Sequence, residues 1–122
     1  MDDPGRRKFE RENSHNLAEY VVLTQQGNPL HRYMGRTFNV SEGGILLETH
    51  KPIVQDKDVI VTIALDEEML ELRGRVKHVK QLEGSVFHAG IEFLKVDERE
   101  KKVLQWYITA LKHNQHTWKS AS

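Results

Sequence analysis

The sequence contains no cysteine among its 122 residues. Disulfide bonds, catalysis by a thiolate and cysteine-based zinc sites are therefore excluded. The chain also has no net charge, because 18 basic residues balance 18 acidic residues. Proteins that bind DNA or RNA without regard to sequence usually carry a basic excess over the whole domain. We therefore expect no DNA or RNA partner.

Long apolar runs are missing as well. No run approaches the roughly 18 apolar residues of a membrane-spanning helix. The first residues, MDDPGRRKFERENSH, lack the apolar segment of a secretory signal. We therefore expect a cytoplasmic protein without membrane insertion. The length fits one domain with a modest hydrophobic core.

Several short segments have the composition or the alternation of β-strands, and turn signals such as GNP at 27–29 separate them. In the fifth segment, alternate apolar residues share one face until Val79 breaks the phase. This break predicts a bulge or a strand end near His78. The segments are residues 18–26, 32–40, 44–49, 57–65, 70–78 and 85–94.

The C-terminal segment, residues 96–114, changes to a helical period and predicts an amphipathic helix. Asp97 and Glu100 have the spacing of a capping box, with Asp in place of the usual Ser or Thr. Trp106 lies at the edge of the apolar stripe, and we expect it to pack against the core. Trp106 and Trp118 could instead belong to a partner surface. The stripe consists of Val103, Leu104, Tyr107, Ile108 and Leu111.

The order of these segments predicts a mainly β fold. About six short strands followed by one helix are typical of a small antiparallel barrel or sandwich that the helix covers. Residues 1–16 contain little apolar surface and are expected to form an extended or loosely ordered arm. Residues 17–113 then form the barrel and the helix, and residues 114–122 form a frayed tail.

The arm contains a cluster of cations. Residues 6–11, RRKFER, carry four cations against one anion, a local net charge of +3. Guanidinium groups pair in a bidentate manner with phosphate oxygens and with the O6/N7 edge of guanine. The cluster is therefore either a binding site for a small anion or ordinary solvated surface. Its cations are Arg6, Arg7, Lys8 and Arg11.

Residues 39–44, NVSEGG, connect two apolar segments. Asn39 and Ser41 have side chains that bond to nearby backbone in ordinary turns. Gly43 and Gly44 tolerate unusual backbone angles and let another backbone approach closely. The segment is therefore a simple hairpin turn or one wall of a site for a polar ligand.

Gly90 is the third feature of interest. The alternation of residues 85–94 places Gly90 on the outer face, together with His88 and Glu92. A glycine on that face has no reason to be small for the core. It can mark the place where a backbone or a ligand lies flat against the barrel, a bulge, or a neutral surface position. The inward residues are Phe87, Ala89, Ile91 and Phe93.

Together these segments resemble the PilZ domain, the bacterial receptor module for the second messenger cyclic di-GMP. Arg7 to Arg11 fits the motif RxxxR, and residues 39–44 fit (D/N)xSxxG about 28 residues further on. The segment AGIEFL follows near the end of the strand set. The resemblance covers roughly residues 6–112.

The resemblance implies a six-stranded antiparallel barrel with a C-terminal helix, and an arm that wraps the ligand against the outside of the barrel. Arg7 and Arg11 would engage guanine edges and phosphates. Asn39 and Ser41 would contact a guanine or the adjacent phosphate, and Gly44 would keep the turn open. The position of Arg6 is thought to influence whether one ligand or a stacked pair binds. The expected ligand-binding residues are Arg6, Arg7, Arg11, Asn39, Ser41, Gly44 and Gly90.

Many members of the family carry Asp where this chain has Asn39. A carboxylate can accept both guanine donors, whereas an amide has one acceptor oxygen. The affinity of this chain could therefore be lower than that of members with Asp.

The expected function is that of a cyclic di-GMP receptor or adaptor that needs no cofactor and signals through a protein partner, as a monomer or a homodimer. The alternative is a ligand-independent interaction module in motility or pilus machinery, because some PilZ-like domains lack the arginine motif. We expect no enzymatic activity. No HExxH pattern occurs, and His113 and His116 lack further metal ligands nearby.

Overall fold

Seven strands and one helix make up the described part of the chain. The computed structural model describes residues 12–13, 17–65 and 68–121. The strands and the helix are β1 (Glu12–Asn13), β2 (Leu17–Leu23), β3 (Pro29–Val40), β4 (Gly44–Thr49), β5 (Asp58–Leu65), β6 (Glu68–Gln81), β7 (Phe87–Phe93) and α1 (Glu98–Ala121).

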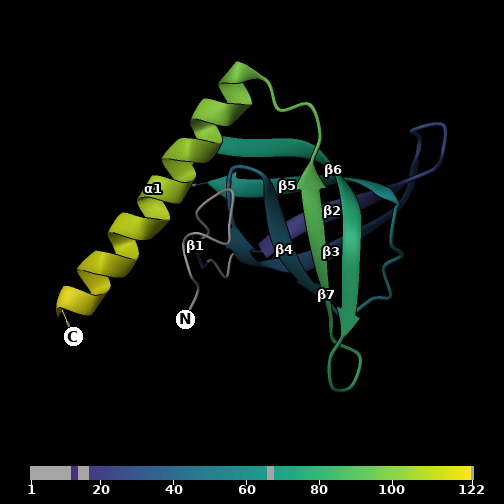
Figure 1. Ribbon diagram of the computed structural model, residues 1–122, viewed down its shortest axis with the longest axis horizontal. Coiled ribbons are helices and arrows are strands. Elements are labelled where there is room, and N and C mark those ends of the chain that lie inside the picture. Colours follow the sequence, from purple (N-terminus) through teal and green to yellow (C-terminus); the bar gives the residue numbers. More distant parts are fainter. Residues whose placement is uncertain (1–11, 14–16, 66–67, 122) are drawn as a thin grey trace.

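Strands β2 to β7 form a closed antiparallel barrel (Figure 1). The strand order is β3-β2-β5-β6-β7-β4, and the pairing of β4 with β3 closes the ring. The two longest strands, β3 and β6, each pair with one neighbour along the first part of their length and with another along the last part. β3 pairs first with β2 and then with β4, and β6 pairs first with β5 and then with β7. The predicted six-stranded barrel with a C-terminal helix is confirmed.

The core lies inside the barrel and under one end of the helix. Alternate strand residues point inward, as the period of two requires. Tyr20 is fully buried, and its hydroxyl lies 2.6 Å from the Thr49 Oγ1. Burial raises the pKa of the Tyr20 phenol. Within the described residues, every buried side-chain nitrogen or oxygen has a hydrogen-bond partner. Other large, fully buried side chains are Ile45, Leu47, Ile63, Leu70, Leu72 and Leu104.

The capping box of α1 is present. The Asp97 N–H donates to the Glu100 Oε1 at 3.0 Å, and the Glu100 N–H donates to the Asp97 Oδ1 at 2.7 Å. Leu104 and Tyr107 are buried against the barrel. Trp106 is 50% exposed, so the expected core packing is wrong. Successive residues of an α-helix are rotated by about 100° around its axis. Trp106 therefore points away from the face on which Leu104 and Tyr107 are buried.

Some boundaries differ from the prediction. β2 ends at Leu23, because the Thr24 N–H donates to the Asn28 carbonyl at 2.8 Å and Gly27 adopts a φ of 86°. The helix continues to Ala121, although residues 114–122 were expected to fray. The expected bulge is present, as a shift of register in β6 between Val76 and His78. The division into arm, barrel and tail stays a prediction.

Candidate ligand site

The short strand β1 lies along the NVSEGG segment. Glu12 pairs with Val40, and Asn13 pairs with Asn39. β1 also contacts α1, so it lies between the helix and β3 (Figure 1). Sequence reasoning missed β1, because a strand of two residues has no periodicity. The chain that follows RxxxR therefore runs beside the start of the second motif.

The arginines Arg6, Arg7 and Arg11 lie outside the described residues. Their expected contacts with a ligand stay predictions. The structure does place the next residue, Glu12, which follows Arg11 directly in the sequence and pairs with Val40 of β3. Any ligand that these arginines bind beside β1 would also be near Asn39.

Ser41 holds the turn between β3 and β4. Its side chain is 2% exposed, and its hydroxyl oxygen accepts the N–H groups of Gly43 and Gly44, both at 3.2 Å. The hydroxyl in turn donates to the Gly44 carbonyl at 3.3 Å. Glu42 in the same turn accepts a bond of 3.2 Å from the Gln105 amide of α1. Ser41 therefore shapes the loop, and its direct contact with a ligand stays a prediction.

Gly44 lacks a side chain for a reason of space. It pairs with Glu92 of β7, and a Cβ at this position would overlap the carbonyl oxygen of Ile91. Its φ is not positive, so conformational freedom is not the requirement. The final glycine of the motif therefore lets β4 lie close to β7, the close approach of another backbone that the sequence pattern allowed. Its expected role of keeping the turn open for a ligand stays a prediction.

Four residues form a continuous row across the outside of the barrel. Asn39 of β3 pairs with Leu46 of β4, Leu46 pairs with Gly90 of β7, and Gly90 pairs with His78 of β6. Paired residues on antiparallel strands point to the same face. We call Asn39, Leu46, Gly90 and His78 the outer row. It begins at the segment that β1 pairs with and extends about three strand spacings, or roughly 14 Å.

Gly90 lies on the outer face of the barrel, as predicted, but it is not a neutral surface position. It is buried, and the imidazole of His78 lies where its side chain would be. The bulge between Val76 and His78 turns the histidine onto this face. The feature that lies against Gly90 is therefore a side chain of β6. The expected role of Gly90 in ligand binding stays a prediction.

A second outer row lies beside the first. His88 of β7 pairs with Glu48 of β4, and their Nε2 and Oε1 atoms are 3.1 Å apart, at hydrogen-bond distance. The ring of Phe38 lies 5.0 Å from the ring of His88, centroid to centroid. The side chains of His88 and Glu48 are mostly covered, at 17% and 26% exposure. Sequence reasoning missed Glu48 and Leu46, although the alternation of residues 44–49 already places both outward.

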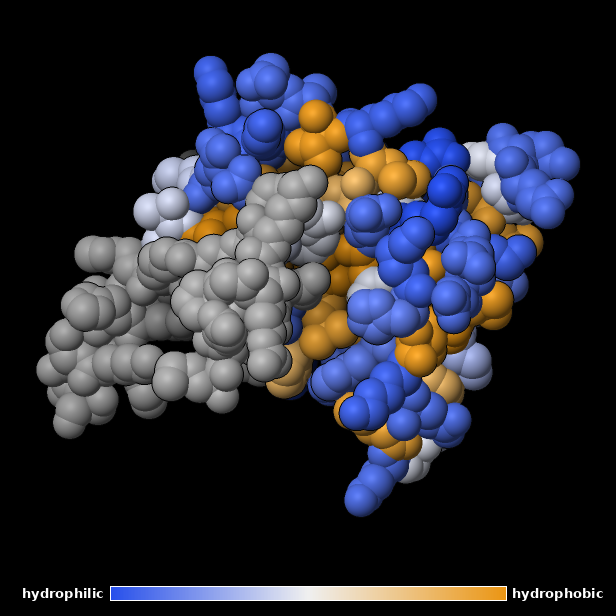
Figure 2. All heavy atoms as spheres, in the orientation of Figure 1, coloured by the Kyte–Doolittle hydropathy of each residue, from blue (hydrophilic) through white to orange (hydrophobic). Residues whose placement is uncertain are grey.

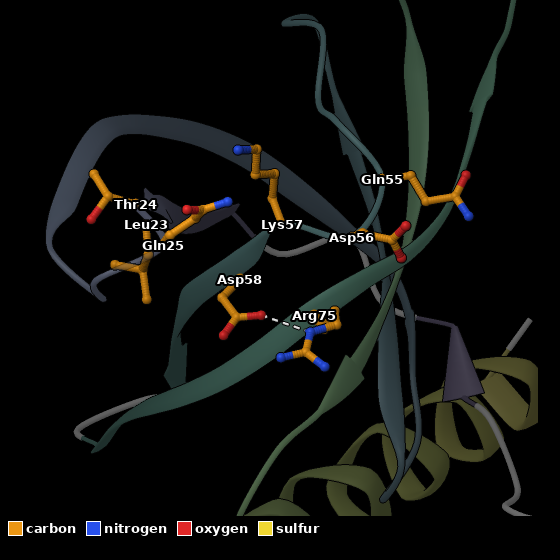
Figure 3. Close-up of a pocket in the computed structure, with 8 residues that line it drawn as sticks. All are labelled: Leu23, Thr24, Gln25, Gln55, Asp56, Lys57, Asp58 and Arg75. Atoms are coloured by element: carbon orange, nitrogen blue, oxygen red, sulfur yellow. Dashed lines mark hydrogen bonds and ion pairs between the residues drawn. The ribbon is translucent and has the colours of Figure 1, made fainter.

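A separate pocket of about 430 Å³ lies between the end of β2 and the start of β5 (Figure 3). Asp58 accepts hydrogen bonds from the Arg75 Nε at 2.8 Å and from Arg73 at 3.0 Å. These two hydrogen bonds lower the pKa of the Asp58 carboxyl, and the bond from Arg75 has the larger effect. None of the lining residues belongs to the predicted site. They are Leu23, Thr24, Gln25, Gln55, Asp56, Lys57, Asp58 and Arg75.

The surface is mixed in character. Hydrophilic residues cover much of the face that Figure 2 draws, with hydrophobic side chains visible between them. In the described ranges, no group of three or more His, Asp or Glu side chains could hold a metal ion. Across those same residues, α1 is not apolar enough to cross a bilayer.

Solved structures resemble the chain in fold. The PilZ domain with c-di-GMP of YcgR from Escherichia coli matches with a TM-score of 0.76 and 14% identity, over 96% of this chain and 99% of that one. The K. pneumonia MrkH–c-di-GMP complex matches with a TM-score of 0.73 and 15% identity, over 92% of this chain and 55% of the MrkH chain. The Bacillus subtilis inhibitor of motility, MotI/DgrA, matches with a TM-score of 0.70 and 15% identity, over 92% of this chain and 52% of the MotI/DgrA chain.

The chain thus spans about half the length of the MrkH and MotI/DgrA chains and nearly all of the YcgR domain. No curated protein matches the sequence. A family model described as PilZ domain matches residues 5–110. That range includes both motifs and every strand of the barrel. The chain therefore belongs to the PilZ domain family.

Proposed function

We propose that this protein is a receptor for cyclic di-GMP, which binds on the outer row between the arm and the barrel. One observation carries the proposal. β1 pairs with Val40 and Asn39, so the residues after RxxxR run along the first residues of (D/N)xSxxG. The segment that directly follows RxxxR thus lies beside the start of the second motif, which is about 28 residues further on in the sequence. The structures of YcgR and MrkH that resemble this chain are c-di-GMP complexes, which supports the same ligand class.

The charges and shapes of the two sides are complementary. Cyclic di-GMP carries two phosphates and two guanines, and residues 6–11 supply a local charge of +3. Guanidinium forks of Arg7 and Arg11 suit both phosphate oxygens and the guanine O6/N7 edge. In this proposal Ser41 and Gly44 give the loop its shape, and Asn39 contacts a guanine.

Replacing Asn39 by Asp tests that contact. We expect Asn39→Asp to bind cyclic di-GMP more tightly, because a carboxylate accepts both the N1–H and the N2–H₂ donors of guanine. A charge-assisted bond is also roughly twice as strong as a neutral one. Titration of both proteins at one salt concentration measures the difference. Weaker binding by the Asp variant would contradict a direct contact between residue 39 and guanine.

Binding also stabilises the folded chain. A ligand that binds only the native state raises stability by about 2.7 kcal/mol at a hundredfold excess over Kd. We expect cyclic di-GMP to raise the melting temperature, and GTP at the same concentration to leave it unchanged. Equal shifts with both nucleotides would indicate nonspecific binding of anions.

In this proposal the ligand also changes the conformation of the arm, residues 1–16, and a protein partner recognises the change. Limited proteolysis tests this step. Cleavage within residues 1–16 should slow when cyclic di-GMP is added, and cleavage elsewhere should not change. If the ligand binds and the arm is cut at the same rate, the signal leaves the domain by another route.

The second candidate function is a protein-interaction module. Leu17, Met34 and Met69 are exposed apolar residues on the outside of the barrel, at 63%, 57% and 68% exposure. Met69 pairs with Ala64, which is also exposed, and Met34 pairs with Glu19. Such side chains favour a protein contact. They are compatible with the receptor as well, since the proposed receptor acts through a protein partner.

A further inference from the structure

His78 occupies an unusual position against the backbone of Gly90. A Cβ built on Gly90 would overlap the imidazole, with the Nδ1 atom at 2.9 Å and two other ring atoms closer. Real Cβ atoms do not approach other atoms this closely, so the ring occupies space that only a glycine leaves free. Gly90 and His78 are also directly paired across β7 and β6.

The same imidazole remains open to solvent. His78 is an exposed residue, although one side of its ring rests on Gly90. The bulge between Val76 and His78 fixes the direction in which the side chain leaves β6. The result is an aromatic ring that is supported from below and accessible from above. Because the ring already rests on Gly90, little side-chain entropy is lost when a base stacks on it.

The ring also lies at the end of the row where the proposed ligand binds. Gly90 has no side chain and Leu46 is half-buried, so the surface between His78 and Asn39 carries one apolar side chain and no charge. The row spans roughly three strand spacings. That length suits a ligand with two bases, one near Asn39 and one near His78.

We propose that His78 is the platform on which one guanine of the ligand stacks, and that Gly90 is a glycine because the imidazole lies on it. The inference rests on the proposed function, since the base belongs to cyclic di-GMP. Stacking on an aromatic side chain depends on the π-face and not on hydrogen bonds. Gly90 is thus a positioning residue, which acts on the ligand through His78.

Titration with cyclic di-GMP tests both roles. We expect His78→Ala to weaken binding about 5- to 150-fold, the range for loss of one stacked base. His78→Phe keeps a flat ring without its nitrogens and should bind nearly as well as the unsubstituted chain. His50→Ala is the matched control, because His50 is another exposed histidine, at the far end of β4, and should have no effect.

A double-mutant cycle tests the part played by Gly90. Gly90→Ala should weaken binding when His78 is present, because its methyl group displaces the ring. The same change should have little further effect in the His78→Ala background. Equal losses in both backgrounds would mean that Gly90 contacts the ligand directly, and would overturn its role as a support. If Gly90→Ala does not fold, the three histidine variants still decide whether the ring is a platform.

The remaining outcomes separate the two levels of the proposal. No binding by the unsubstituted chain would overturn the proposed function and this inference together. Binding that His78→Ala leaves unchanged would overturn this inference and leave the receptor intact. If His78→Phe binds as weakly as His78→Ala, the ring nitrogens act by hydrogen bonding, and the stacking platform is wrong.

Discussion

Replacing Arg7 or Arg11 by alanine is expected to weaken the binding of cyclic di-GMP about 5- to 150-fold. A bidentate contact between Arg and guanine contributes roughly 1–3 kcal/mol of discrimination, and each 1.4 kcal/mol is about a factor of ten in Kd. These arginines precede β1, which is paired with the segment that begins at Asn39. Calorimetric titration of each variant gives the change in Kd directly.

Lys8→Ala is the matched control for this experiment. Lys8 lies between the two arginines and carries the same charge, but it occupies a variable position of RxxxR. Lys8→Ala should weaken the binding of cyclic di-GMP less than either arginine variant does, because an ammonium group cannot form the bidentate pair. Unchanged affinity in both arginine variants would contradict their assignment. Equal losses in all three variants would indicate that the net charge of the arm matters and the guanidinium geometry does not.

Gly44→Ala is expected to destabilise the barrel, and binding should fall with it. The new methyl group would overlap the Ile91 carbonyl oxygen, so β4 must move away from β7. Overpacking of this kind typically costs about 1–3 kcal/mol. Urea denaturation without ligand measures the change in the free energy of unfolding.

Glu42→Ala serves as the comparison, because Glu42 lies in the same turn and its carboxylate accepts a hydrogen bond from the exposed Gln105 amide of α1. Its effect on stability should stay within about 0.5 kcal/mol. If Gly44→Ala is as stable as the unsubstituted chain but no longer binds, then Gly44 acts on the ligand. In that case the close approach of β4 and β7 is not the reason for this glycine.

The barrel could be predicted because its strands carry local signals. Alternation identified the inward faces of β6 and β7, and the break at Val79 located the bulge. The capping box at Asp97 and Glu100 marked the start of the helix, since both bonds join residues three apart. Features of this kind depend on near neighbours in the sequence, so they are visible in it.

The site was harder to predict, because its contacts join distant segments. The pairing of Asn13 in β1 with Asn39 joins two distant segments of the chain, and β1 has no pattern of its own. The outward direction of Gly90 was predicted correctly, but the ring that covers it comes from β6. The space at Gly44 is limited by the backbone of β7, which motif spacing does not reveal. Each of these depends on strand register, which the sequence specifies only through the complete fold.

The most direct test of cyclic di-GMP binding is calorimetric titration of the unsubstituted protein with this ligand, with GTP and cyclic di-AMP as controls. We predict saturable binding of cyclic di-GMP with a stoichiometry of one ligand or a stacked pair, and no saturable binding of either control. Absence of binding to cyclic di-GMP, or equal binding of cyclic di-AMP, would contradict the claim that this PilZ domain is a receptor for cyclic di-GMP.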